Sequence, residues 1–173
     1  MDNTALFFKI SNLSRHSQIL DSLMLFATDY LIYLMALFVL ILSFKGGIKE
    51  KKAFLLIILG LPVAVLIIKV IHLFYYEPRP FVTFQLAPLV KETMDASFPS
   101  RHATIAAVIA FAYTYFKSRW LPLLLISMVL VGISRIYVGV HYPLDVLGGS
   151  AVGAISLYLA LQIKNLLKFY LLR

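Results

Sequence analysis

The sequence predicts an all-α integral membrane protein, a helical bundle of about five transmembrane helices with an N-terminal interfacial amphipathic helix. Of its 173 residues, 61% are hydrophobic, whereas soluble domains are nearer to half apolar. The apolar residues fall in long runs, and the proline-containing stretches "EPRP", "FPS" and "HYP" lie at run boundaries, where proline ends or begins helices. With no internal repeat, we expect a single domain over residues 1–173, with its motifs between about 53 and 160.

Five runs approach the roughly 20 residues that a transmembrane helix needs. They cover residues 22–44, 53–74, 101–117, 119–139 and 144–165. Asp29 lies inside the first run, where it is either buried against a partner or marks a shorter span that begins after it. The third and fourth runs have few strictly apolar residues for a span, so they must carry polar groups at their ends. Residues 3–20 alternate apolar and polar side chains at near-helical spacing, which predicts the interfacial helix.

Basic residues are concentrated in three segments that five spans would place on the same side. These are the loop "KGGIKEKK", the loop "KSR" and a tail with Lys164, Lys168 and Arg173. The positive-inside rule makes this side cytoplasmic and the other side extracytoplasmic, as expected for a bacterial plasma membrane protein. We attribute the net charge of +8 to contact with anionic lipid of the bilayer and expect no nucleic-acid partner. No cleavable signal peptide is predicted.

The chain has no cysteine, which excludes disulfides, thiolate nucleophiles and cysteine-based metal sites. Three histidines, His72, His102 and His141, fall on the predicted outer side. None has the close spacing of a metal-binding helix pair, so we expect neither a metal nor another cofactor.

Three polar clusters fall at the predicted outer ends of different helices. They are "HLFYYEPRP" at 72–80, "PSRH" at 99–102 and "SRIYVGVHYPLD" at 134–145. Ionisable residues at membrane depth are costly, so three such clusters on one side favour a functional site.

The third cluster has the spacing of a nucleophilic histidine with its carboxylate partner. His141 and Asp145 are separated by four residues across the start of a helix, which places them on one face. Asp145 can accept the Nδ1 proton and leave Nε2 free to attack. Arg135 and Arg79 come from two helix ends, and two guanidinium groups suit a tetrahedral phosphoryl group.

The second cluster places Ser100 where it can cap a helix whose N–H groups would face a bound anion. His102, in the first turn, can protonate a departing oxygen as a general acid. Taken singly, a histidine near a helix end is more often structural, and Arg79 and Arg135 can be interfacial side chains that reach toward water. Their occurrence together favours catalysis.

These motifs resemble those of the type 2 phosphatidic-acid phosphatase superfamily, whose pattern is K-x6-R-P, P-S-G-H and S-R-x5-H-x3-D. The matching stretches here are Arg79-Pro80, Pro99 to His102, and Ser134-Arg135 with His141 and Asp145. "FYYEPRPF" and "DASFPS" further resemble the bacterial undecaprenyl-diphosphatase branch. The resemblance implies a metal-independent phosphatase that works through a phosphohistidine. It makes His141 the nucleophile, Asp145 its partner and His102 the acid, with Arg79, Ser100 and Arg135 on the phosphoryl group.

Two positions depart from the family pattern. The family lysine is replaced by His72, and Lys69, one turn earlier, either supplies the missing cation or reaches toward the outer interface. Arg101 replaces the family glycine. A cation in the first turn opposes the helix dipole unless an anion lies nearby, so Arg101 either contacts the second phosphate of a diphosphate or binds a lipid headgroup.

The expected activity is hydrolysis of a polyprenyl diphosphate, with undecaprenyl diphosphate as the first candidate, in recycling of the cell-wall lipid carrier. Alternatives are a broader lipid phosphatase acting on phosphatidylglycerol phosphate or phosphatidic acid, and a lipid phosphotransferase. A non-catalytic protein that binds or transports anionic lipid is the alternative from another class. Such a protein would not need His141, His102 and Asp145 together, and a transporter should carry more deep charges than Asp29 and Lys69.

Overall fold

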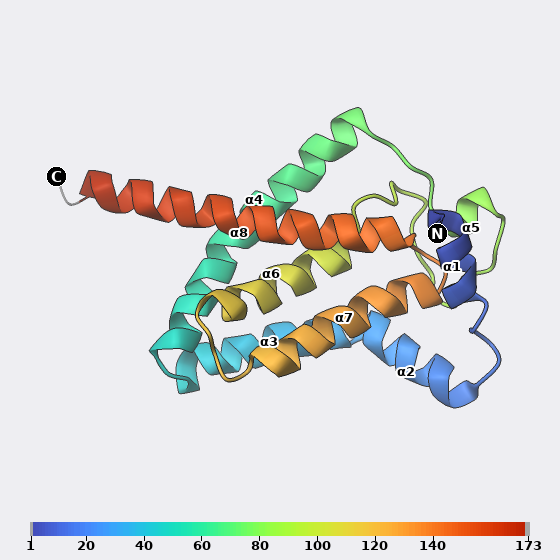
Figure 1. Cartoon of the computed structure of the whole chain (residues 1–173), viewed down its shortest axis with the longest axis horizontal. Coiled ribbons are helices and arrows are strands. Elements are labelled where there is room, and N and C mark those ends of the chain that lie inside the picture. Colours follow the sequence, from blue (N-terminus) through green and yellow to red (C-terminus); the bar gives the residue numbers. More distant parts are fainter. Residues whose placement is uncertain (1, 172–173) are drawn as a thin grey trace.

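The computed structural model describes residues 2–171, with side chains described for residues 2–166. All regular structure in this part of the chain is helical, as the sequence predicts (Figure 1). The helices are α1 (Asn3–Ser11), α2 (Gln18–Asp29), α3 (Leu31–Lys45), α4 (Ile48–Phe74), α5 (Pro80–Thr83), α6 (Arg101–Tyr115), α7 (Leu121–Tyr137) and α8 (Pro143–Leu171). Arg173 and the side chain of Lys168, both used above to assign the cytoplasmic side, lie outside the described residues.

Helix α6 is the centre of the bundle. Its alanine-rich sequence leaves buried side chains on nearly every face, the pattern of a helix surrounded by protein. Helices α3, α4, α7 and α8 all contact it. Their apolar side chains share one core with α6, which includes Met35, Leu56, Val108, Val131 and Leu157.

Two glycines let α8 approach α6 closely. A Cβ atom on Gly149 would lie 2.6 Å from the Ser100 carbonyl oxygen, and one on Gly153 would lie 2.7 Å from the Ala107 Cβ. Neither distance is tolerable for a real side chain, so hydrogen is the only substituent that fits at this spacing. The small residues therefore fix how near the start of α8 lies to the start of α6.

The two ends of the bundle differ in chemistry. Where α6 and α8 begin and α7 ends, α1 and α5 are also gathered, at the right of Figure 1. At the opposite end, the α3–α4 and α6–α7 connections meet. Ser118 donates a 2.8 Å hydrogen bond to the buried Glu50, and Lys49 Nζ lies 3.3 Å from the Lys117 carbonyl oxygen. The lysine-rich loops therefore lie far from the motif-bearing end.

Within the described residues, two helices are long and apolar enough to cross a membrane, α4 and residues 143–166 of α8. The pair α2–α3 becomes a third if its two bent halves count as one span. Helices α6 and α7 match the expected runs but have 15 and 17 residues, below the roughly 20 that a straight span needs. The count of about five spans stays a prediction.

The expected single span over residues 22–44 is broken. Its helix bends by 51° between α2 and α3, at Tyr30, whose φ of −118° departs from helical geometry. A polar contact lies close to the break: the buried Thr28 accepts a 2.9 Å hydrogen bond from Arg135 Nη1. The bend thus brings the end of α2 to the arginine.

The expected helix over residues 3–20 is also divided. Helix α1 ends at Ser11, Arg15 takes a left-handed φ of 67°, and Ser17 caps the start of α2 by accepting from the Leu20 amide. Phe7 is fully buried, with its ring centroid 5.5 Å from that of Tyr142. Helix α1 is therefore packed onto the motif-bearing end of the bundle by an aromatic contact.

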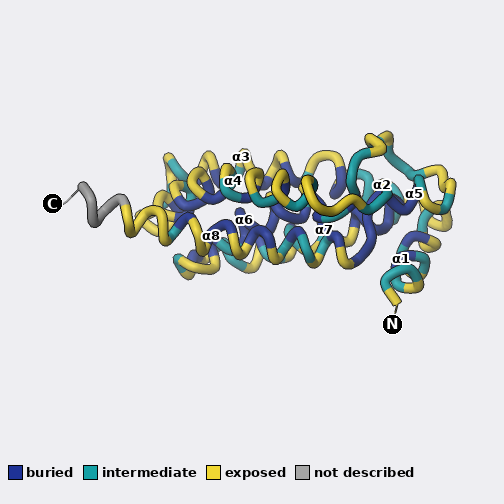
Figure 2. Tube along the Cα trace, turned by 90° about the horizontal axis from the view of Figure 1, so that it is seen from above, coloured by how far each residue is buried: buried dark blue, intermediate teal, exposed yellow. Residues whose placement is uncertain are grey.

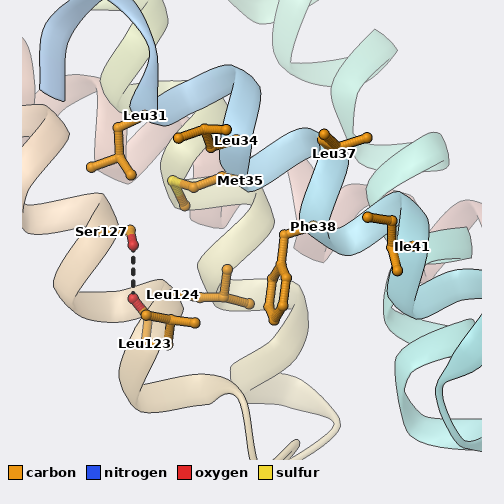
Figure 3. Close-up of a pocket in the computed structure, with 9 residues that line it drawn as sticks. All are labelled: Leu31, Leu34, Met35, Leu37, Phe38, Ile41, Leu123, Leu124 and Ser127. Atoms are coloured by element: carbon orange, nitrogen blue, oxygen red, sulfur yellow. Dashed lines mark hydrogen bonds between the residues drawn. The ribbon is translucent and has the colours of Figure 1, made fainter. Parts of the chain in front are cut away.

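In the view of Figure 2, exposed residues follow the outer surfaces of the helices and buried residues follow the middle of the bundle. One apolar groove of about 360 Å³ opens between α3 and α7. Figure 3 shows that leucine side chains, Met35, Phe38 and Ile41 line it. The single polar lining residue, Ser127, donates its hydroxyl to the Leu123 carbonyl oxygen at 2.9 Å. The groove offers hydrocarbon contact and no titratable group.

The α6–α8 spacing gives a stability prediction. Gly153→Val should lower the free energy of unfolding by about 1–3 kcal/mol, because the added methyl groups overlap Ala107. The matched control is Ala154→Val, at the next, exposed position of the same helix. Thermal unfolding of the purified protein in detergent measures both. Equal unfolding temperatures for the two variants would contradict a tight α6–α8 contact.

Candidate active site

The first turn of α6 is joined to the first turn of α8. The Ser100 side chain caps α6 by accepting from the Ala103 amide, and the Ser100 amide donates to the Asp145 carbonyl oxygen at 3.0 Å. Ser100 and Asp145 are both fully buried. The capping role expected of Ser100 is therefore observed, and the same residue sets the distance between two helix N-termini.

His141 and Asp145 form the pair that their spacing predicts. His141 Nδ1 lies 3.3 Å from Asp145 Oδ2. The same carboxylate oxygen accepts from the Tyr142 amide at 2.7 Å and from the Ser97 hydroxyl at 2.5 Å. These bonds hold the carboxylate beside Nδ1 and orient the imidazole, which leaves Nε2 as the free ring nitrogen.

The His141 imidazole is held neutral. Burial lowers its pKa well below the ordinary 6.5, and the positive charges of Arg135 and Arg79 act in the same direction. A lowered pKa extends the neutral form to more acidic pH. Because only a neutral imidazole has a free electron pair on Nε2, this environment favours a nucleophilic role.

Arg79 and Arg135 meet at one carboxylate. Their side chains are 2% and 3% exposed. Glu92 Oε2 lies 3.6 Å from Arg79 Nη1 and also pairs with Arg135 Nη2. Two buried guanidinium groups from separate elements, the α4–α5 connection and the end of α7, thus converge on a single anionic oxygen.

A second carboxylate serves the other edge of Arg79. Asp95 Oδ1 accepts from Arg79 Nε at 3.1 Å and from Nη2 at 2.7 Å, and Asp95 Oδ2 pairs with Arg101. Thr93 also donates to Asp95, at 2.9 Å. Three guanidinium groups therefore share two carboxylates, which leaves one positive charge in excess.

Both carboxylates are ionised. Burial alone would raise the pKa of Glu92, but the Arg135 and Arg79 charges outweigh it and lower that pKa. For Asp95, burial is outweighed by hydrogen bonds from Thr93 and Arg79, so its pKa is also lowered. Even so, Arg79 Nη1 and Arg135 Nε are buried without a hydrogen-bond partner in the described structure. The arginines retain donors for a further anion.

His102 belongs to the same group of charges. It lies in the first turn of α6 and is partly buried. Its ring is within electrostatic range of four of the side chains above, Arg135, Glu92, His141 and Arg101. The ring of His102 thus lies near the predicted nucleophile, where the sequence predicts a general acid.

Lys69 and His72 lie in a separate groove, together with Arg101. This groove, of about 220 Å³ between α4 and α6, is lined by both residues together with Arg101. Its remaining lining is apolar except for Thr104, with Leu61, Ala64, Val65, Ile68 and Ile105. His72 Nε2 lies 3.1 Å from the Phe98 carbonyl oxygen. The two residues considered for the missing family lysine thus share one face of α4.

Three residues of the site are absent from the sequence-based set, namely Glu92, Ser97 and Thr28. Ser97 and Glu92 lie in the connection between α5 and α6, and neither has a periodic spacing that marks it. Asp95, which also lies in this connection, pairs with two arginines, Arg79 and Arg101. In residues 2–166, no group of three or more histidine, aspartate or glutamate side chains is placed to hold a metal ion.

Comparison with known proteins extends these observations. Residues 51–168 match the family model described as the PAP2 superfamily. Undecaprenyl-diphosphatase BcrC of Bacillus subtilis (strain 168) is 39% identical over 96% of this chain and 86% of its own. The bacitracin transport permease protein BcrC of Bacillus licheniformis is 31% identical over 89% of this chain and 76% of its own.

The fold has a counterpart among solved structures. The crystal structure of Aquifex aeolicus LpxE superposes with a TM-score of 0.67 and 28% sequence identity, covering 92% of this chain and 94% of that one. The region that matches the family model, residues 51–168, contains α6, α7, most of α8 and every histidine and arginine of the site. On the family match and on its motifs, assembled at one end of the bundle, the chain belongs to the PAP2 superfamily.

Proposed function

We propose that this protein is an integral membrane phosphatase that hydrolyses undecaprenyl diphosphate to undecaprenyl phosphate and inorganic phosphate. Membership of the PAP2 superfamily supports phosphatase chemistry. The relative named undecaprenyl-diphosphatase, similar over 96% of this chain, supports the substrate. The helices long and apolar enough to cross a membrane suit a lipid substrate.

One observation carries the proposal. Glu92 places an anionic oxygen between two buried guanidinium groups that still have unpartnered N–H donors, and this position lies close to the neutral His141 imidazole. A phosphoryl group offers three oxygens to such donors, and arginine recognises it in bidentate fashion. The site is therefore built to hold a phosphoryl group beside a histidine nucleophile.

In the first step, His141 Nε2 attacks the terminal phosphorus and forms a P–N bond. The bond from that phosphorus to the bridging oxygen breaks, and His102 gives this oxygen a proton as undecaprenyl phosphate leaves. Arg79 and Arg135 balance the charge on the phosphoryl oxygens during transfer. Asp145, 3.3 Å from Nδ1, stabilises the positive charge on the phosphorylated imidazole.

In the second step, water replaces the histidine. His102, now neutral, takes a proton from the water molecule as its oxygen attacks phosphorus. The P–N bond breaks, inorganic phosphate forms, and His141 and His102 return to their starting states. The residues alone provide nucleophile, acid and base, so the proposed cycle requires no cofactor.

The groove between α4 and α6 is the proposed path of the lipid. Its apolar lining, with Leu61, Val65 and Ile105, suits the first isoprene units of the chain. Its basic and imidazole side chains, Lys69, Arg101 and His72, lie where the lipid would meet the diphosphate. We assign the phosphate next to the lipid to Arg101 and Lys69, and the terminal phosphate to Arg79 and Arg135.

We place the active-site end on the extracytoplasmic side of the membrane, in a five-span topology with the N-terminal helix at the interface. The lysine-rich α3–α4 and α6–α7 connections lie together at the other end. The positive-inside rule favours a cytoplasmic location for that end.

Phosphate release by the purified protein in detergent with EDTA tests the proposal. Undecaprenyl diphosphate should be hydrolysed, and His141→Ala should lower the rate at least about 1,000-fold because the nucleophile is lost. His16→Ala, at an exposed position before α2, is the control and should retain activity.

The substrate comparison separates the alternatives. Phosphatidylglycerol phosphate, assayed in parallel, should be a poorer substrate. Comparable release from both lipids would indicate a broader lipid phosphatase. No release from either lipid would contradict the proposal and favour phosphotransfer or a non-catalytic role in lipid binding or transport.

Arg101 gives a prediction about the second phosphate. Arg101→Gly should reduce turnover of the diphosphate more than turnover of a monophosphate lipid, by roughly tenfold or more, the worth of one charge-assisted hydrogen bond. Arg119→Gly is the matched control, since Arg119 lies over the Trp120 ring in the α6–α7 connection. Equal losses with both lipids would instead assign Arg101 to general headgroup binding.

Ser97 is predicted to position the histidine through its carboxylate. Ser97→Ala removes a hydrogen bond to a charged group, which is worth about 1.5–3 kcal/mol. We expect kcat to fall roughly 10- to 100-fold with little change in KM. Ser150→Ala removes a hydroxyl that bonds within α8 and should leave kcat unchanged. A rise in KM alone would contradict a positioning role.

A further inference from the structure

Glu92 has a contact that the proposed reaction does not use. Its carboxylate is 18% exposed and lies between Arg79 and Arg135, where the terminal phosphate of the substrate would bind. One anionic oxygen, Oε2, forms ion pairs with both guanidinium groups. The carboxylate thus stands in the position of a phosphoryl oxygen, supplied by the protein itself.

The fit of this carboxylate is incomplete. Arg79 Nη1 is 3.6 Å from Glu92 Oε2, beyond hydrogen-bond distance, and Arg135 Nε has no partner in the described structure. A carboxylate has two oxygens, whereas a phosphoryl group has three and more negative charge. A phosphate can therefore satisfy donors that Glu92 leaves unpaired.

The backbone around Glu92 allows the side chain to withdraw. The connection between α5 and α6 is fastened on either side of Glu92, by the Leu89 amide to the Val138 carbonyl oxygen at 3.1 Å and by the Ser97 amide to the Glu77 carbonyl oxygen at 2.8 Å. Within it, Thr93 and Met94 are exposed. Glu92 can leave the arginines without unwinding a helix.

We propose that Glu92 is an internal anion that occupies the terminal-phosphate position between turnovers and limits the affinity of the site for product phosphate. This inference rests on the proposed function, because it assigns Arg79 and Arg135 to the terminal phosphate. Every ligand must displace Glu92. The lipid substrate has further contacts in the α4–α6 groove and at Arg101, whereas inorganic phosphate has only the arginines.

The consequence is weak retention of product phosphate. Displacing Glu92 costs substrate and product the same free energy, but the substrate offsets this cost with its further contacts. When a competing state blocks a site, the apparent dissociation constant rises by the reciprocal of the open fraction. If the site is open for about a tenth of the time or less, phosphate binds at least about tenfold more weakly than the bare arginines would allow. The returning carboxylate then aids phosphate release.

The test is direct binding of inorganic phosphate to the purified full-length protein in detergent, by isothermal titration calorimetry. Glu92→Gln keeps the size of the side chain and removes its charge, so the dissociation constant for phosphate should fall at least about tenfold. Inhibition of lipid hydrolysis by added phosphate should strengthen in parallel.

Glu77→Gln is the matched control. Glu77 precedes Arg79 in the same connection, and its carboxylate accepts from the Tyr75 hydroxyl at 3.1 Å. It contributes the same charge on the same side of the molecule without pairing with an arginine in the described structure. Its substitution should change phosphate affinity less than twofold. Equal tightening in both variants would reduce the effect to general electrostatics and overturn the proposal.

A second variant keeps the proposal testable if Glu92→Gln does not fold. Glu92→Asp keeps the charge but is one methylene shorter and bridges the two arginines less well, so its phosphate affinity should rise by a smaller factor. Unchanged phosphate affinity in the folded variants would also overturn the proposal. The binding measurement does not require turnover. If the protein hydrolysed neither lipid but Glu92→Gln still bound phosphate more tightly, the result would contradict only the proposed function.

Discussion

The hydrogen bond from the Ser100 amide to the Asp145 carbonyl oxygen holds two helix N-termini together, and the site depends on it. It places the first turn of α6, with His102, beside the first turn of α8, with the partner of His141. Only a glycine at position 149 permits this contact, because any Cβ there would strike the Ser100 carbonyl oxygen. The close packing of α6 and α8 therefore also determines the geometry of the site.

The fold must also compensate the free-energy cost of burying Arg79 and Arg135. A buried guanidinium group is costly unless anions surround it, and the α5–α6 connection provides Glu92 and Asp95 for this purpose. The same low exposure that makes the arginines costly strengthens their attraction for a phosphoryl group. The charges of these arginines and carboxylates thus determine both the stability of the free protein and its attraction for a phosphoryl group.

The features predictable from sequence were those governed by local spacing. The i, i+4 relation of His141 to Asp145, the cap at Ser100 and the approximate ends of α4, α6, α7 and α8 follow from helix geometry. Glu92 and Ser97 were not predictable, because their partners depend on the path of an irregular connection. The break at Tyr30 was predictable in part, because Asp29 inside the apolar run left open a shorter span that begins after it. The contact of Thr28 with Arg135 was not predictable, because the two residues lie more than a hundred positions apart.

That hydrogen bond, from Arg135 to Thr28, bears on where the working unit of the protein begins. The family match starts at residue 51, yet Thr28 belongs to α2 and the fully buried Phe7 to α1. A fragment trimmed to the family boundaries would contain every motif residue but expose the inner side of Arg135 and remove an aromatic support from Tyr142. The boundaries of the family match therefore leave out three helices, α1 to α3, two of which support the site.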